Sequence, residues 1–225
     1  MAHLSSKFVL KRARALRKVQ ESAKRKWVWD EKSLAAWDSA IQGVEDQQTV
    51  ETKSKAALNA AHSRFISEYR DLRARTLQEL GMLKNRHRND TIKLARLAAL
   101  SARGGAHQSI LVEALALQVV WKELEQDGSS TGENPLSSFA TLVLRCIHAH
   151  NAEATAEMKW KADCESLNQK ERNLEFATAA WYADATLIFA KGTVEGNVIR
   201  STISAATYPK DALPASKLPV TSARV

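Results

Sequence analysis

One short cluster of side chains could in principle bind a metal ion or act as a nucleophile: Cys146-x-His148-x-His150. In a helix only Cys146 and His150 would share a face, because residues two apart point in nearly opposite directions. A structural zinc site needs four ligands. A cysteine–histidine nucleophile needs a third group that orients the base, together with donors for an oxyanion. The sequence supplies neither set. We therefore expect no catalytic residue, no metal ion and no cofactor, and no small-molecule substrate is evident.

Basic side chains, which can bind phosphate groups, are concentrated in two segments. Residues 1–26 hold nine Lys and Arg and one Glu, and residues 64–103 hold ten Lys and Arg and four acidic residues. Residues 104–200 have the opposite balance, with eight basic and thirteen acidic residues. A basic stripe attracts phosphates through counterion release, and such binding weakens with salt. The candidate contacts to nucleic acid or to an acidic partner are Lys7, Lys11, Arg14, Lys18, Arg25, Arg86 and Arg88.

Two other interpretations of these basic segments remain open. The basic side chains can be solvated or paired with acidic residues of the same protein, and a basic amphipathic helix can lie on an anionic membrane surface. No motif that recognises a base sequence is present, since zinc-finger spacing, an aromatic RNP-like strand and a GxxG loop are all missing. Any nucleic-acid binding is therefore expected to be independent of sequence.

The six tryptophans are mostly expected in the core, because Trp buries a large apolar area. Those on predicted apolar helix sides are Trp29, Trp37, Trp121, Trp160 and Trp181. Trp27 and Trp29 flank a predicted helix break beside the basic segment, where they could instead stack on a nucleic-acid base or on a partner. We predict an apolar interface made by Phe8, Val19 and Trp27.

Helix formers fill the first 134 residues, which contain no proline, and apolar side chains recur there at helical spacing. The predicted helices cover residues 5–26, 31–84, 91–102, 107–126 and 136–190. Asp30 is the expected cap of the second helix, and Asn89 or Asp90 that of the third. The polar stretch 43–55 suggests a kink or a short loop. Residues 192–200 are expected to end the last helix and to form a tight turn by which the chain returns.

Helices of about 50 residues are roughly 75–80 Å long, whereas a compact domain of this size has a radius of gyration of only about 17 Å. We therefore predict an all-α fold, an elongated antiparallel bundle with two very long helices (about 31–84 and 136–190) and shorter helices between them. The predicted division is a basic N-terminal helix or arm (1–29), the bundle (30–204) and a loose, proline-containing tail (205–225).

The composition narrows the function mainly by exclusion. The most apolar stretch, 110–121, is too short for a membrane span and is interrupted by Glu113 and Gln118. Two cysteines make no disulfide framework, so a reducing, cytoplasmic compartment is expected. We predict a non-enzymatic structural or assembly protein, a helical bundle that self-associates or docks on a protein partner. The alternative is a nucleic-acid-associated protein of low sequence specificity that uses the N-terminal helix and the basic segment 84–103.

Overall fold

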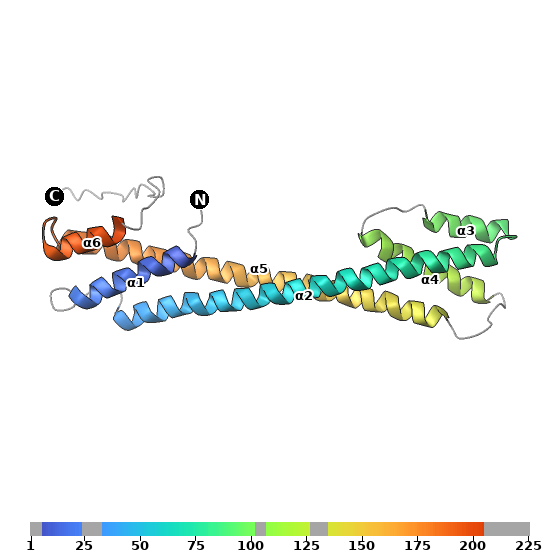
Figure 1. The fold of residues 1–225 in the computed structure, drawn as a ribbon, viewed down its shortest axis with the longest axis horizontal. Coiled ribbons are helices and arrows are strands. Elements are labelled where there is room, and N and C mark those ends of the chain that lie inside the picture. The colour runs from blue at the N-terminus through green and yellow to red at the C-terminus, as the bar shows by residue number, and fades with distance from the viewer. Residues whose placement is uncertain (1–5, 24–32, 102–106, 127–134, 205–225) are drawn as a thin grey trace, which may run out of the picture. The chain divides into compact units, whose positions relative to one another are not determined.

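The computed structural model describes residues 6–23, 33–101, 107–126 and 135–204, and every structural statement below concerns these residues (Figure 1). They form six helices and no strand. The helices are α1 (Ser6–Ala23), α2 (Leu34–Arg86), α3 (Thr91–Ser101), α4 (His107–Gln126), α5 (Pro135–Ile188) and α6 (Val194–Ser204). The predicted all-α bundle with two very long helices is confirmed, since α2 has 53 residues and α5 has 54.

Helix α2 runs without interruption through the polar stretch 43–55, where the sequence suggested a kink. It begins at Leu34, because the Ser33 hydroxyl accepts a hydrogen bond from the backbone N–H of Ala36 at 3.2 Å and so caps the first turn. The predicted cap Asp30 lies outside the described residues. At α3 the prediction is confirmed for Asp90, whose Oδ1 accepts hydrogen bonds from two backbone N–H groups of the first turn.

Helix α6 replaces the tight return predicted for residues 192–200. Gly192 ends the preceding segment with a φ of 101°, a conformation that favours glycine. Thr193 then caps α6, because its hydroxyl accepts a hydrogen bond from the N–H of Gly196 at 3.1 Å. Valine, asparagine and glycine are weak helix formers, so local propensity provides little signal for this helix. Packing of Ile199, which is buried in a core, supplies the missing stabilisation.

Close backbone contacts divide the chain into two compact units. Of the described residues, unit 1 contains 6–23, 33–50 and 164–204, and unit 2 contains 51–101, 107–126 and 135–163. Each long helix therefore contributes one part to each unit. The N-terminal helix α1 packs in unit 1, which answers a question that the sequence left open. The predicted tail 205–225 lies outside the described residues.

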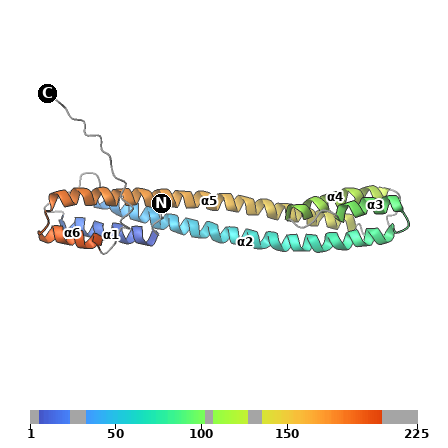
Figure 2. The same ribbon diagram turned by 90° about the horizontal axis from the view of Figure 1, so that it is seen from above.

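The core of unit 1 lies between α1, α6, the first part of α2 and the last part of α5. Helices α1 and α6 lie side by side (Figure 2). The apolar side of α1 faces this core, together with Trp37 of α2, Trp181 of α5 and Ile199 of α6. Both tryptophans are buried as predicted.

Unit 2 has its own core, in which α3 packs on α4 and both cover the second part of α2 and the first part of α5. Trp121 is buried there, as predicted, against Phe139 at a ring-centroid distance of 5.8 Å. Trp160, in contrast, is half-buried.

The long helices run antiparallel within each unit (Figure 1), and polar contacts join them. In unit 1 the ammonium of Lys170 donates to the carbonyl of Gly43 and to Oε1 of Gln47, each at 3.2 Å. In unit 2 the residue numbers of the paired side chains rise along α2 and fall along α5. The pairs are Glu51 with Trp160, His62 with Glu153, and Glu68 with Arg145. These contacts hold the register of α2 against α5 where few apolar side chains are available.

Candidate interaction surfaces

A straight line of cations runs along the solvent side of α1. Lys7, Lys11, Arg14 and Lys18 are all exposed, and their spacing of four, three and four residues places them on one face. The line is about 16 Å long. These four sequence-predicted residues therefore form one continuous basic face, called here the α1 basic face.

The opposite side of α1 holds this helix in unit 1. The indole N–H of buried Trp37 donates to Oε1 of Gln20 at 2.6 Å. Arg17 donates two hydrogen bonds of 2.9 Å to Asp38, and this hydrogen-bonded cation lowers the pKa of the Asp38 carboxyl. Arg14 of the basic face also forms an ion pair with Glu45 of α2. Part of the positive charge of α1 is thus paired with acidic residues of α2.

The other predicted contacts are distributed differently. Arg86 ends α2 and Arg88 lies in the following turn; both are exposed and belong to unit 2. Arg25 lies outside the described residues.

The predicted apolar interface needs a correction at Val19. Its side chain is only 8% exposed and packs in the core of unit 1, because the apolar side of α1 is used to attach α1 to its own bundle. Phe8 is half-buried on the same helix. Trp27, the third predicted residue, lies outside the described residues.

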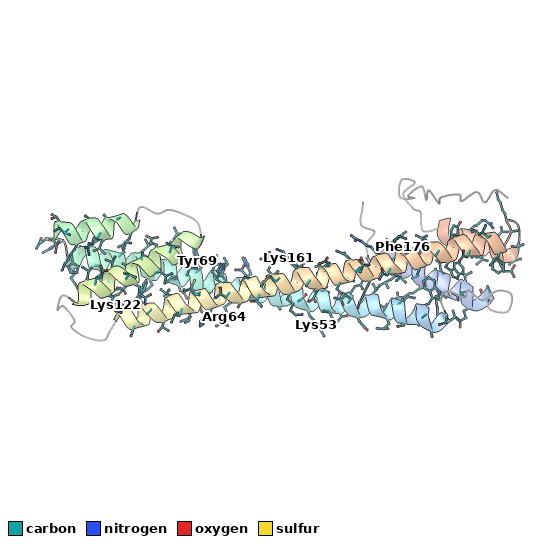
Figure 3. The ribbon with its side chains drawn as sticks, turned by 180° about the vertical axis from the view of Figure 1, so that it is seen from behind. Lys53, Arg64, Tyr69, Lys122, Lys161 and Phe176 are labelled. Carbon is teal, nitrogen blue, oxygen red and sulfur yellow. The ribbon has the colours of Figure 1, made fainter. Side chains whose placement is uncertain are left out.

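An exposed apolar surface that the sequence analysis missed lies on α5 in unit 1. Phe176 is 80% exposed (Figure 3) and Leu187 is 84% exposed. The exposed Ala179 and Ala183 lie between them along the helix. Steps of three, four and four residues place all four side chains on one side of the helix. We call this surface the α5 apolar face. The sequence signal that could have indicated this surface is the distribution of apolar residues in α5, because they lie on two different sides of the helix.

The α5 apolar face carries no charge between Phe176 and Leu187. The acidic residues of this stretch, Glu175 and Asp184, are half-buried on its flanks. Isolated exposed apolar side chains are common on protein surfaces, but contiguous apolar patches are typical of docking sites. The arrangement can therefore bind another apolar surface.

A second exposed apolar stripe lies on α4 in unit 2. Val112, Leu115 and Val119 are exposed at steps of three and four residues, whereas Glu113 of the same helix is buried. The exposed fractions, 50%, 43% and 58%, are well below those of Phe176 and Leu187. The α4 stripe is therefore the weaker of the two candidate docking surfaces.

The Cys146–His150 cluster is part of the core of unit 2. Cys146 is completely buried, and burial raises the pKa of its thiol, which disfavours the nucleophilic thiolate. The ring of His150 packs 5.1 Å from that of Phe65, and His148 is exposed. Nowhere in the described part of the chain do three His, Cys, Asp or Glu side chains gather as a set that could hold a metal ion.

Glu79 is a carboxylate inside the core of unit 2, with 1% exposure. Burial raises its pKa, and the nearby charges of Arg75 and Arg86 oppose this effect. Between the ordinary and the raised pKa, the folded chain binds a proton that the unfolded chain lacks. The free energy of unfolding therefore rises as the pH falls through the raised pKa of Glu79. This gain is complete once the pH reaches the ordinary pKa of a glutamate.

We predict that Glu79→Gln stabilises unit 2 at pH 7 by on the order of 1 kcal/mol, because it removes a buried charge. The substitution should also flatten the rise in stability between pH 7 and pH 5. Urea unfolding at the two pH values measures both effects, and exposed Glu157→Gln is the control. A loss of stability at pH 7 would mean that the 2.6 Å ion pair with Arg75 outweighs the burial of the charge.

None of the described helices is both long and apolar enough to cross a membrane. No protein-family model matches the chain, and neither the curated proteins nor the solved structures contain a significant match.

Proposed function

We propose that the protein is a non-enzymatic helical assembly protein that docks on another protein chain through the α5 apolar face. The single observation that carries this proposal is the high exposure of Phe176 and Leu187 on a side of α5 without charge. Burying a Leu or Phe side chain contributes about 1.5–3 kcal/mol, so two such side chains can drive docking. The sequence-based expectation of an assembly protein is retained, with a different apolar surface.

The test replaces both large side chains with charges, as Phe176→Glu/Leu187→Glu. Burying two carboxylates at an apolar contact is unfavourable, so assembly should weaken by at least about a hundredfold. The tagged chain is purified from its own cells, and native mass spectrometry and analytical ultracentrifugation report the mass of the assembly. Because both residues are exposed, circular dichroism should show unchanged helix content.

Met158→Glu is the matched control, since Met158 is 66% exposed on α5 but is flanked by Glu157 and Lys159. This control should assemble as the wild type does. If the wild type forms neither a homo-oligomer nor a stoichiometric complex with another protein, or if the double variant assembles equally well, the proposed docking function is wrong.

A second candidate function, sequence-independent nucleic-acid binding, is favoured by the exposure of the whole α1 basic face. We expect Lys7→Gln/Lys11→Gln/Lys18→Gln to weaken the binding of labelled DNA and RNA and to reduce the salt slope by about 2–3. Fluorescence anisotropy across a salt series measures this change. The control, Lys53→Gln/Lys55→Gln/Lys122→Gln, removes three exposed charges elsewhere. Equal binding by both triple variants would contradict this function.

A further inference from the structure

The α5 apolar face is suited to one particular occupant, which deepens the proposed docking function and rests on it. We propose that this face binds the same face of a second copy of the chain, antiparallel, around a two-fold axis between Ala179 and Ala180.

The spacing of the face is symmetric when the helix direction is reversed. The exposed residues on this side of α5 are Arg172, Phe176, Ala179, Ala183 and Leu187, and Ala180 lies half-buried at its edge, where it partly packs on the core of unit 1. Phe176 and Ala183 are equally far from the midpoint between Ala179 and Ala180, and so are Arg172 and Leu187. A two-fold contact uses the same patch on both subunits. An antiparallel second copy therefore places Phe176 opposite Ala183, and Leu187 opposite Arg172.

The sizes of the side chains favour this antiparallel arrangement. It sets a large side chain against a small one, because Phe176 of each copy packs over Ala183 of the other. Alternation of large and small residues across facing positions lets two helices pack at one uniform distance. A parallel pair would set Phe176 against Phe176 and Ala183 against Ala183, and these layers need different distances between the helices.

The charges favour a second copy as the occupant. The part of the face between Phe176 and Leu187 carries no charge and selects a partner surface without charge, because a buried unpaired charge opposite it would cost several kcal/mol. The same face of a second copy meets this condition. At its ends, the aliphatic part of Arg172 can cover Leu187 of the second copy while the guanidinium stays in water at the rim.

The small area of the α5 apolar face predicts a dimer that dissociates readily. The six side chains offer on the order of 500 Å² per copy, or about 1,000 Å² in total, which is close to the lower limit for a specific interface. Interfaces of this size are typical of transient complexes. We therefore expect a dissociation constant on the order of 10–100 µM.

The experiment combines a mass measurement with a test of orientation. Analytical ultracentrifugation follows the mass of the wild type, Phe176→Glu and the Met158→Glu control as the concentration rises through this range. Orientation is tested in a chain carrying Gln169→Cys and Cys164→Ser, mixed with isotope-labelled chains. Gln169 and the end of α5 at Ile188 are about 28 Å apart along one chain, and Lys191 lies just beyond this end. The antiparallel dimer brings position 169 of one copy next to Lys191 of the other, within reach of a short amine–thiol cross-linker.

The expected result is a dimer that Phe176→Glu weakens at least tenfold, with a cross-link from the introduced thiol to Lys191 between differently labelled chains. A dimer that depends on Phe176 but in which the two introduced thiols form a disulfide on mild oxidation with added oxygen, with no cross-link to Lys191, would overturn the antiparallel arrangement. A monomer at all these concentrations would overturn the second copy as occupant. In that case, a stoichiometric complex with a different protein that depends on Phe176 and Leu187 would leave the docking function itself intact.

Discussion

Trp37→Ala is expected to lower the free energy of unfolding of unit 1 by about 3–5 kcal/mol, the range for truncation of a buried aromatic residue. The Trp37 side chain is completely buried between α2 and α1. Its loss leaves a cavity and also removes the 2.6 Å hydrogen bond to the buried amide of Gln20. Because this indole links the two helices, α1 should be the first element to lose protection against hydrogen exchange.

Three variants separate the causes of this loss. Trp37→Phe retains most of the apolar volume but not the N–H donor, so it should cost about 1–3 kcal/mol. Trp160→Ala is the control, because Trp160 is half-buried and donates to Glu51 in unit 2; it should leave the exchange of α1 unchanged. Urea unfolding gives the free energies. A Trp37→Ala loss of under about 1 kcal/mol would mean that α1 is not held by this contact.

Gly196→Ala is expected to detach α6 from unit 1. A Cβ atom at position 196 would lie 2.3 Å from the carbonyl oxygen of Ala190 and 2.9 Å from that of Phe189. These are backbone atoms of the segment that connects α5 to α6, so the clash cannot be relieved by rotation of a side chain. The Arg200 guanidinium, which donates to the carbonyls of Gly196 and Phe189 at 3.0 and 3.3 Å, would also have to move.

Overpacking of this kind typically costs about 1–3 kcal/mol or more, here confined to α6 and its contacts with α1. Hydrogen exchange should show faster exchange in α6, with little change in unit 2. Gly81→Ala is the matched control, since nothing lies within 4 Å of a Cβ atom at that helical position. It should stabilise α2 by about 0.5–1 kcal/mol. Unchanged exchange in α6 after Gly196→Ala would contradict the close packing at this position.

Local sequence signals determined most of the secondary structure. The absence of proline before residue 135 and the helical spacing of apolar residues predicted α2 and α5 to within a few residues at each end. The cap at Asp90 and the buried positions of Trp37 and Trp181 were also predicted correctly. These features depend on neighbours one to four residues away, or on the large apolar area of a tryptophan, and both can be read from the chain itself.

The identity of the exposed faces was decided by tertiary structure. Val19 and Phe176 are both apolar residues at helical spacing, but Val19 is in the core and Phe176 is in solvent. The spacing of apolar residues shows that a helix has an apolar side, but not whether that side packs in the protein's own core or lies in solvent. The sequence alone therefore could not assign the interface. On α5 this ambiguity is greatest, because Trp181 and Phe176 point to different sides of one helix and only one of these sides packs in the core of unit 1.

The sequence by itself therefore determined an all-α protein with two very long helices and an N-terminal helix whose cations share one face. Tertiary structure decided the rest: two cores, α1 as a packed helix, α6 in place of a turn, and an apolar face of α5 left in solvent. The physical reason is the range of the interactions. Helix formation and capping act within a few residues, whereas burial depends on contacts between segments more than a hundred residues apart, such as α1 and α6.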